Sequence, residues 1–325
     1  MFQKLKNRIE KFKKESDSVA ILESSSEMKE YVNKFINFPG LQKEASCGLS
    51  FAERCRFVLK GCALGDYAGQ PYEAESLLEC KYLKKDDLYQ ESIDITEDTV
   101  LACATADVIL NNLKSNTKKR FDETYKFYAK EYTHPLGGYG ARFLAWVYTG
   151  VDPNSCGNGA AMRVGSCGCF DKIEDVVSMA YESAVCTHHH QEGIKGAIVT
   201  AVCIWMAFHG YSKEDIGSYC AFHYQGSPYS PAYDFETLLS YKETKGSPAV
   251  CQTTVPMAVS CFVNSESYED CILKAIQFGW DTDTQASVAG SIAAAYYQSF
   301  SEESNKVYEK LKQNPYIKNI LKLTE

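Results

Sequence analysis

The sequence Phe278-Gly279-Trp280-Asp281-Thr282-Asp283-Thr284 stands directly before a run of small residues at 287–298. Small side chains in and next to this run recur at i, i+3, i+4, i+7 and i+8, the spacing of one helix face. They are Ala286, Ala289, Gly290, Ala293 and Ala294. A face without bulk lets a second helix approach closely. The pattern therefore predicts a tightly packed helix with the Asp-Thr-Asp-Thr motif at its start.

Asp281 and Asp283 lie two residues apart at this predicted helix start. Buried like charges repel each other and lose hydration, which costs free energy unless a cation neutralises them. The simpler interpretation is that Asp283 or Thr284 only caps the helix. A cluster of similar composition earlier in the chain favours the cation.

This first acidic cluster is the segment Thr96-Glu97-Asp98-Thr99, which again precedes an apolar helical pattern, and residues 281–284 form the second acidic cluster. Carboxylates and hydroxyls from two such clusters are the oxygen ligands that Mg²⁺ or Mn²⁺ prefers. Neither cluster contains a histidine or a cysteine, which argues against zinc. The two clusters together indicate a site for hard divalent cations.

A third stretch, upstream of both clusters, carries glycines at 61, 65 and 69, four residues apart. This spacing again predicts a helix face for close contact. The helix is expected to end at Pro71-Tyr72, and Glu73 follows. Glu73 is either a loop charge or a residue of a reacting site.

Glycine-marked loops lie between the two acidic clusters. Residues 155–163 include Gly157-Asn158-Gly159 and offer backbone N–H groups at a predicted helix start, a natural place for phosphate. The segment lacks a P-loop lysine, which argues against nucleoside-triphosphate hydrolysis. Further on, Thr187 is followed by three histidines, which cannot all point to one side. We expect His188 to point inward and its two neighbours to face solvent.

The composition of the 325 residues is that of a globular protein, with 14 cysteines and a net charge of −8. The cysteines are scattered through apolar stretches and no export signal precedes them, which predicts reduced thiols in the cytoplasm. No apolar run is long enough to span a membrane. The net negative charge argues against a general nucleic-acid-binding protein.

The periodic segments are mostly helical and no series of alternating strands is found, which predicts an all-α fold. Residues 1–50 are expected to form a helical extension, with a basic amphipathic helix over residues 1–14. Residues 51–325 are expected to form the main domain. Residues 224–248, rich in Tyr, Ser, Pro and Gly, are expected to form a surface loop.

Several of these stretches together resemble one family, the ADP-ribosylglycohydrolases, and they occur in the family's order. The family includes the enzyme that reactivates ADP-ribosylated dinitrogenase reductase and the eukaryotic ADP-ribosyl-acceptor hydrolases. The matching stretches are 61–73, 96–99, 139–146, 157–163, 187–188 and 281–284. The resemblance covers about residues 51–300 and implies an all-helical fold with two magnesium ions in a central cleft, where manganese is an alternative.

The resemblance also implies roles for individual residues. The expected metal ligands are Thr96, Asp98, Asp281, Asp283 and Thr284. Glu97 stands where the family has aspartate, in a Thr-Asp-Asp-Thr motif, so direct ligation, ligation through water and no ligation all remain open. Asp98 or Asp283 is expected to accept a proton, and Glu73 matches a glutamate that contacts metal or substrate in some members.

Substrate contacts follow from the same resemblance. The loop Gly157-Asn158-Gly159 is expected to hold the diphosphate, and Tyr139 and His188 are expected to contact the substrate from the cleft wall. Hydrolysis at the ribose anomeric carbon passes through an oxocarbenium-like centre, and metal ions can orient the sugar and activate the attacking water. The expected substrate is an ADP-ribosylated protein, with the linkage left open.

Two other classes of function remain open. A catalytically weak or inactive member could serve as a binding or structural protein, although Asp98, Asp281 and Asp283 are all retained. A different two-metal hydrolase, such as a phosphoesterase, is the second alternative. Residues 1–50 resemble the added segment of bacterial immunity proteins of this family, which would let the chain bind and block an ADP-ribosyltransferase toxin.

Overall fold

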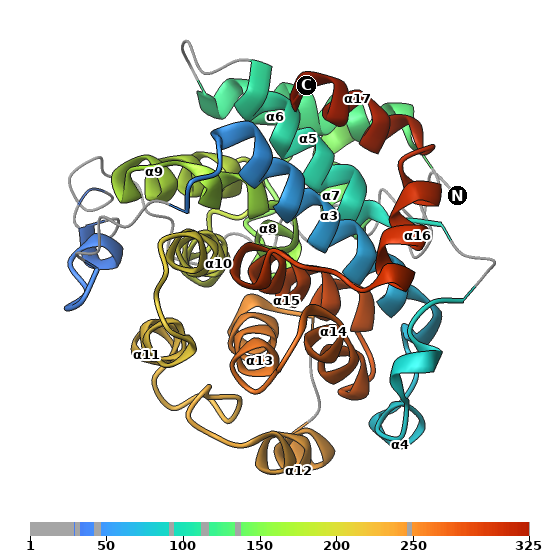
Figure 1. The fold of residues 1–325 in the computed structure, drawn as a ribbon. Coiled ribbons are helices and arrows are strands. Elements are labelled where there is room, and N and C mark those ends of the chain that lie inside the picture. The colour runs from blue at the N-terminus through green and yellow to red at the C-terminus, as the bar shows by residue number, and fades with distance from the viewer. Residues whose placement is uncertain are drawn as a thin grey trace.

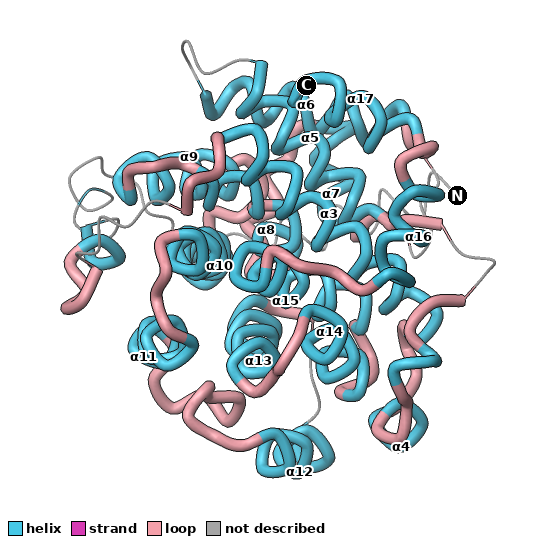
Figure 2. The backbone as a smooth tube through the Cα atoms, in the orientation of Figure 1, coloured by secondary structure: helices cyan, strands magenta, loops and turns pink. Residues whose placement is uncertain are grey.

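The computed structural model describes residues 29, 33–41, 47–90, 94–111, 117–133, 138–245 and 249–324. Within these ranges the chain is built of helices and contains no strand (Figures 1 and 2). Extended pairing is limited to isolated contacts such as the antiparallel bridge between Gly157 and Val250. The predicted all-α fold is confirmed.

The helices follow one another along the chain with short connections. In order they are α3 (Phe51–Gly69), α4 (Leu77–Cys80), α5 (Glu97–Asn111), α6 (Thr117–Glu131), α7 (Ala141–Thr149), α8 (Gly159–Arg163), α9 (Ile173–Ala184), α10 (Gln191–Phe208), α11 (Lys213–His223), α12 (Phe235–Lys245), α13 (Cys251–Val263), α14 (Tyr268–Gln277), α15 (Thr282–Tyr297), α16 (Glu302–Leu311) and α17 (Pro315–Thr324). Three short 3-10 helices are η1 (Gln70–Tyr72), η2 (Lys85–Asp87) and η3 (Gly165–Cys169).

The predicted glycine stripe of α3 packs directly against the small-residue face of α15. A Cβ atom on Gly61 would overlap the carbonyl oxygen of Gly290, and one on Gly65 would overlap the carbonyl oxygen of Ala286. Backbone therefore meets backbone along this contact, which only glycine permits. The predicted close approach of these two helices is confirmed.

Helix α15 is the centre of the molecule. Helices α3, α10, α13 and α14 all pack against it (Figure 1). Residues 282–295 of α15 and 196–208 of α10 are all buried. Helices that are buried on every side need apolar or small side chains all round, as these two sequences provide. The start of α15 is consequently held rigidly from several directions.

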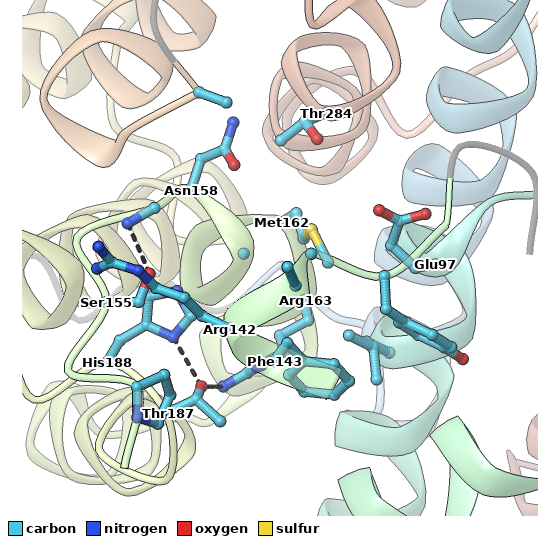
Figure 3. A pocket seen from close by; sticks show the side chains of 18 of the residues that line it. Glu97, Arg142, Phe143, Ser155, Asn158, Met162, Arg163, Thr187, His188 and Thr284 are labelled. Carbon is cyan, nitrogen blue, oxygen red and sulfur yellow. Dashed lines mark hydrogen bonds between the residues drawn. The ribbon is translucent and has the colours of Figure 1, made fainter. Parts of the chain in front are cut away.

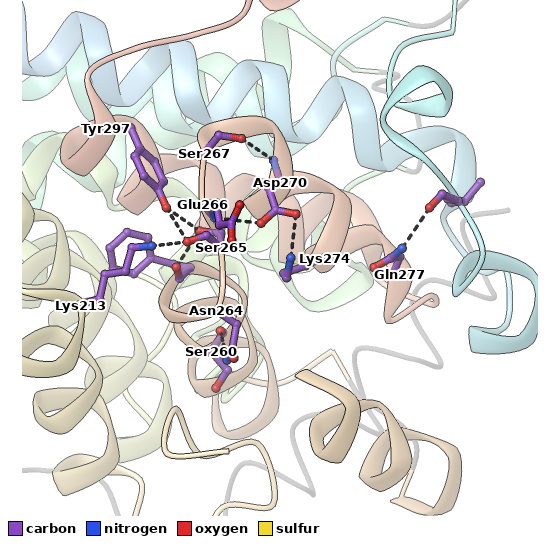
Figure 4. Close-up of polar contacts among 12 residues, drawn as sticks. Lys213, Ser260, Asn264, Ser265, Glu266, Ser267, Asp270, Lys274, Gln277 and Tyr297 are labelled. Carbon is purple, nitrogen blue, oxygen red and sulfur yellow. Dashed lines mark hydrogen bonds and ion pairs between the residues drawn. The ribbon is translucent and has the colours of Figure 1, made fainter. Parts of the chain in front are cut away.

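The turn between α13 and α14 is fixed by polar contacts around Ser265 (Figure 4). Its carbonyl oxygen accepts hydrogen bonds from the Lys213 ammonium of α11 and, at 2.8 Å, from the Tyr297 hydroxyl of α15. Within α14, Asp270 forms an ion pair with Lys274 at 2.7 Å. The Ser265 contacts join α11 and the C-terminal end of α15 to the turn before α14, and the ion pair stabilises α14 itself.

Residues 224–248 do not form the expected surface loop, and that prediction was wrong. Helix α12 occupies most of the second half of this segment. The Asp234 carboxylate accepts the Thr237 backbone N–H at 2.9 Å, which stabilises the helix start. Leu238 and Tyr229 are fully buried. Within α12, Phe235, Leu238 and Leu239 have helical spacing, but this pattern covers little more than one turn and is too short to indicate a helix.

Residues 33–41, the described part of the predicted extension, pack onto α11. Phe35 is 2% exposed and its ring stacks on His223 with 4.5 Å between centroids. Phe38 contacts two further aromatic rings of α11 edge-on. This part of the extension therefore covers the main domain. The basic helix predicted over residues 1–14 lies outside the described residues.

All 14 cysteines carry free thiols, and all except Cys47 and Cys156 are buried. The prediction of unpaired core thiols is confirmed. None of the helices in the described ranges combines the length and the apolar character needed to span a bilayer.

Candidate functional site

A cleft of about 400 Å³ opens between the first turns of α5 and α15 and the loops that precede α7 and α8 (Figure 3). Its wall includes one residue of the first acidic cluster, Glu97, and two of the second, Asp281 and Thr284. The other predicted site residues on the wall are Glu73, Tyr139, Gly157, Asn158, Gly159 and His188. Both acidic clusters and the glycine loops therefore face one cavity.

Three of the expected metal ligands lie behind this wall. Thr96, Asp98 and Asp283 are at most 4% exposed and are absent from the cleft surface. The Thr96 hydroxyl accepts the backbone N–H of Asp98 at 3.2 Å, so it also caps α5. Asp98 nevertheless reaches the second cluster, since its Oδ1 atom lies 3.5 Å from Thr284 Oγ1.

Asp66 is a site residue to which sequence reasoning assigned no role. It lies inside α3 with no exposed surface. Its Oδ2 atom accepts the backbone N–H groups of Thr96 at 3.0 Å and Thr99 at 3.1 Å, and the Thr99 hydroxyl at 2.5 Å. The first acidic cluster is thus attached to the glycine-rich helix. In the sequence, Asp66 could have been recognised as a lone aspartate among the small residues of α3.

The second acidic cluster is attached to the same end of α3. The Thr282 hydroxyl donates to the Gly69 carbonyl at 2.7 Å. A Cβ on Gly69 would overlap the backbone of Thr282 and Asp283, so glycine is required there. Trp280, just before the helix, has φ of 67° in the left-handed region, which is uncommon for a bulky residue.

Capping by Asp283 accounts for only part of this cluster. Asp281 is the N-cap residue of α15, but its side chain makes no capping hydrogen bond. Its Oδ2 atom instead accepts the Asn158 amide at 2.5 Å. Asp283 Oδ1 accepts only the N–H of the next residue, Thr284, at 2.8 Å. Asp281 Oδ1 and Asp283 Oδ2 take part in neither of these hydrogen bonds and remain available for other partners.

Burial and mutual repulsion raise the pKa values of these acids. Burial comes first in each case and raises the pKa of Asp66 to about 6 and of Glu97 to about 8. The pKa values of Asp98 and Asp283 lie well above the usual carboxyl range because of burial and then repulsion by Asp283 and Asp281 respectively. The protein's own groups therefore do not neutralise the negative charges of these carboxylates.

The donor set fits a hard divalent cation. Asp66 Oδ1, Glu97 Oε2 and Asp98 Oδ2 are buried and make no hydrogen bond within the described chain. Such orphaned oxygen atoms are suited to metal coordination. Across the described ranges, however, no group of three or more His, Cys, Asp or Glu side chains could by itself hold a metal. Hydroxyl, carbonyl or water oxygens would have to complete the coordination.

The Gly157-Asn158-Gly159 loop is tied to the rest of the cleft. The Gly157 N–H donates to Ser155 Oγ at 3.0 Å, and the Asn158 N–H donates to the Ala249 carbonyl at 3.3 Å. The Asn158 amide also donates to Thr254 Oγ1 at 3.0 Å, besides its contact with the second acidic cluster. Two of the three predicted N–H donors of this loop are therefore already engaged by the protein.

His188 points inward as expected. It is 5% exposed, and burial followed by the Arg163 charge lowers its pKa well below the ordinary value. Its neighbours are half-buried rather than solvent-facing, because each has a local role. His189 contacts Asp152 at 2.6 Å, and the ring of His190 caps the N-terminus of α10.

Aromatic and basic side chains complete the wall (Figure 3). The rings of Tyr139 and Phe143 lie 5.4 Å apart, and Phe143 lies 5.5 Å from Trp146. Phe143 and Arg142 line the cleft, although no role was predicted for them. They belong to the matching stretch 139–146, but only the folded chain shows which of its side chains face the cavity.

Comparison with known proteins agrees with this geometry. The sequence model of the family described as ADP-ribosylglycohydrolase matches residues 49–313. The chain is 27% identical over 329 residues to ADP-ribosylhydrolase ARH3 of Bos taurus, in an alignment that covers 78% of this chain and 88% of that protein. ADP-ribosylhydrolase ARH3 of Homo sapiens is 27% identical over 316 residues, covering 75% and 85% respectively.

A solved structure, named as an ADP-ribosylglycohydrolase-related protein complex, is similar in fold. Its TM-score is 0.60 at 20% sequence identity, and the superposition covers 85% of this chain and 99% of that one. At this identity the likeness concerns the fold alone.

Proposed function

This chain belongs to the ADP-ribosylglycohydrolase family and is an ADP-ribosyl hydrolase, and on that premise we propose that it releases ADP-ribose from modified protein side chains using two Mg²⁺ ions. One observation carries the proposal. The first turns of α5 and α15 bring two acidic clusters to one cleft, where buried carboxylate oxygens have no partner within the described chain. An array of this kind is costly without cations.

The proposed ion-binding residues are the two acidic clusters. They are Thr96, Glu97, Asp98, Asp281, Asp283 and Thr284. Bound divalent ions would neutralise the carboxylates, orient the ribose hydroxyls and acidify a nearby water. Glu97 lines the cleft and its Oε2 atom is buried without a partner in the described chain. This placement favours a role at the ions over a solvent-facing side chain.

Asp98 and Asp283 are the two candidates for accepting the proton of the attacking water. Burial keeps the pKa of each well above the usual carboxyl value. These pKa values are those of the protein without ions, and bound Mg²⁺ would lower them, so each candidate rests on its position beside the proposed ions. Glu73, whose pKa burial also raises, lines the cleft beside Asp281 and contacts the substrate in this proposal.

The remaining wall suits the other parts of ADP-ribose. The loop around Asn158 faces the cleft, and the Gly159 N–H, the one predicted donor that the contacts above do not engage, would be the backbone donor to the diphosphate. The partly exposed ring of Phe143, next to Tyr139, offers an apolar surface for stacking of the adenine. His188 completes the polar end of the wall.

The setting and the partner of the protein are part of the proposal. Free thiols at all 14 cysteines support a reducing compartment such as the cytoplasm. An additional immunity role against an ADP-ribosyltransferase toxin depends on residues 1–50, of which the basic stretch 1–14 lies outside the described residues. It therefore stays a prediction from the sequence.

A substrate panel tests the proposed function. The protein would be incubated with arginine-linked and serine-linked ADP-ribosylated proteins, with Mg²⁺, with Mn²⁺ or with chelator, and free ADP-ribose would be measured by mass spectrometry. Release with Mg²⁺ and loss with chelator are expected. Cleavage of a phosphodiester without release of ADP-ribose would favour the other two-metal class, and ADP-ribose binding without turnover would favour a binding protein.

A further inference from the structure

Three residues form a buried hydrogen-bonded chain that ends at the cleft (Figure 3). Arg163 Nη2 donates to Thr187 Oγ1 at 2.8 Å, and Thr187 Oγ1 lies 2.7 Å from His188 Nδ1. Arg163 and Thr187 are each 1% exposed, and His188 is 5% exposed. Because these three hydrogen-bonded groups are buried, neighbouring protein groups rather than water determine the positions of their hydrogen atoms.

The direction of the hydrogen bonds follows from what each group can donate. A guanidinium has only donors, so the Thr187 oxygen accepts from Arg163. Arg163 Nη2 also donates to the Ser183 carbonyl at 3.1 Å. The Thr187 hydroxyl hydrogen then points to Nδ1 of His188, which accepts it. The reverse arrangement would leave a buried hydroxyl hydrogen without an acceptor, a cost of about 1–3 kcal/mol.

The ring of His188 therefore carries its single hydrogen on Nε2. Burial and the neighbouring Arg163 charge lower its pKa well below the ordinary value, so the ring is neutral. This Nε2 edge faces the glycine loop. A Cβ built on Gly159 would lie 3.5 Å from Nε2, and one built on Gly157 would lie 3.9 Å away.

The Gly157 backbone is close enough to the ring to raise its pKa slightly, against the larger lowering by burial and by Arg163. The Gly157 carbonyl oxygen accepts the Cys251 thiol at 3.2 Å, which ties this part of the loop to α13. On the other side of the ring, a Cβ on Gly193 would lie 2.8 Å from the His188 Cβ atom, so α10 fixes the side chain from behind. The ring thus lies between a rigid helix and the loop.

We propose that Arg163 and Thr187 are positioning residues that hold His188 as the neutral Nε2–H tautomer, and that His188 in turn orients the Gly157-Asn158-Gly159 loop for the diphosphate of ADP-ribose. His188 acts here neither as a metal ligand nor as a general base. The identity of the bound ligand rests on the proposed function. The tautomer does not, because it follows from the protein's own hydrogen bonds.

Nuclear magnetic resonance of the full-length protein with ¹⁵N-labelled histidine tests the tautomer directly. The His188 signals are assigned by their loss in His188→Gln. We expect Nε2 to be the protonated nitrogen and Nδ1 the unprotonated one, with no titration through neutral pH. Thr187→Ser keeps the hydroxyl and should keep this pattern. Thr187→Val removes only the hydroxyl and should convert His188 to a mixture of tautomers.

Binding and kinetics test the positioning role. Calorimetry with ADP-ribose as the probe should show roughly tenfold weaker binding for Thr187→Val, since one buried hydrogen bond is lost, and near wild-type binding for Thr187→Ser. With ADP-ribosylated protein, KM should rise while kcat changes little, because the loop contacts a part of the substrate remote from the bond that breaks.

A matched control is Thr200→Val, which makes the same chemical change at a fully buried hydroxyl of α10 outside the cleft wall. It should alter neither the His188 signals nor the affinity. A wild-type Nδ1–H tautomer, or an unchanged tautomer in Thr187→Val, would overturn the hydrogen-bond assignment. An altered tautomer with unchanged ADP-ribose affinity would overturn the positioning role, whether or not the protein hydrolyses the substrates of the panel.

Discussion

Thr284 Oγ1 lies 3.5 Å from Asp98 Oδ1 although 186 residues separate them in the sequence. The contact joins the first turns of α15 and α5, so two helix N-termini point at one place. Their dipoles favour negative charge there, yet the pKa of Asp98 remains well above the usual carboxyl range, first because of burial. The two helix N-termini bring the carboxylates together but do not fully stabilise their negative charges. Bound cations would supply the remaining stabilisation.

Asp66 is expected to organise the first acidic cluster. Asp66→Ala would leave the buried N–H groups of Thr96 and Thr99 and the Thr99 hydroxyl without their acceptor. Each lost partner costs about 1 kcal/mol or more, so we expect the free energy of unfolding to fall by about 3 kcal/mol. Thr99→Val removes one of these bonds and should cost about 1 kcal/mol. Urea denaturation in chelator measures both, and equal stability of Asp66→Ala and wild type would contradict this role.

Glu97 should give the metal-free protein a characteristic pH dependence. Burial raises its pKa from 4.5 to about 8 in the folded protein. The folded state therefore holds this proton more tightly, and stability from this group is lost as the pH rises through that window. Glu97→Gln removes the effect, so its stability advantage over wild type should grow with pH.

Denaturation of wild type and Glu97→Gln in chelator at about pH 6 and about pH 9 measures this difference. His188 and Lys242 are common to both proteins and cancel, whereas Asp98 and Asp283 lose the repulsion by Glu97 in the variant, which increases the difference in the same direction. A constant difference between the two pH values would contradict the shifted pKa. Added Mg²⁺ should reverse the order at high pH if Glu97 contributes to ion binding.

The left-handed backbone conformation of Trp280 is expected to destabilise the folded protein. Its φ of 67° is unfavourable for a bulky residue, and its side chain is 46% exposed. Trp280→Gly should therefore leave the free energy of unfolding unchanged or raise it by up to about 1 kcal/mol. Gln298→Gly, at a φ of 49°, is the matched control. Thermal denaturation that shows a loss of more than about 1 kcal/mol for Trp280→Gly would mean that the indole packs productively.

Phe35 is expected to attach residues 33–41 to α11. It is 2% exposed and stacks on His223. Phe35→Ala should lower the free energy of unfolding by about 3 kcal/mol, as usual for a buried phenylalanine. The neighbouring exposed Lys34→Ala should stay within about 0.5 kcal/mol of wild type. If both variants are equally stable, this segment does not support the domain.

Local sequence patterns predicted those parts of the fold that depend on residues close together in the chain. The glycine stripe at 61, 65 and 69 and the small face of α15 are each visible within one helix, and they do pack together. Helix α12 was missed because its apolar pattern is short and its start depends on a single acceptor, Asp234.

In the site too, local sequence patterns predicted some features, whereas contacts between distant residues were missed. Both acidic clusters are contiguous in the sequence, and they do meet at one cleft. Asp66 binds Thr99 across 33 residues, and Arg163 binds Thr187 across 24. Such contacts leave no local pattern, because only the packing of separate helices brings the partners together. The placement of Arg142 and Phe143 on the cleft wall depends on the same packing.

Mg²⁺-dependent release of ADP-ribose by wild type, Asp98→Asn and Asp283→Asn tests the central claim most directly. Each substitution removes one buried negative charge from the cleft with little change in shape. We expect wild-type release to require Mg²⁺ and each variant to lose roughly two orders of magnitude or more in kcat/KM, with cooperative unfolding retained. Asp86→Asn, at an exposed acid of η2, should behave as wild type. Full activity in excess chelator, or in the Asp98→Asn/Asp283→Asn double variant, would contradict the account.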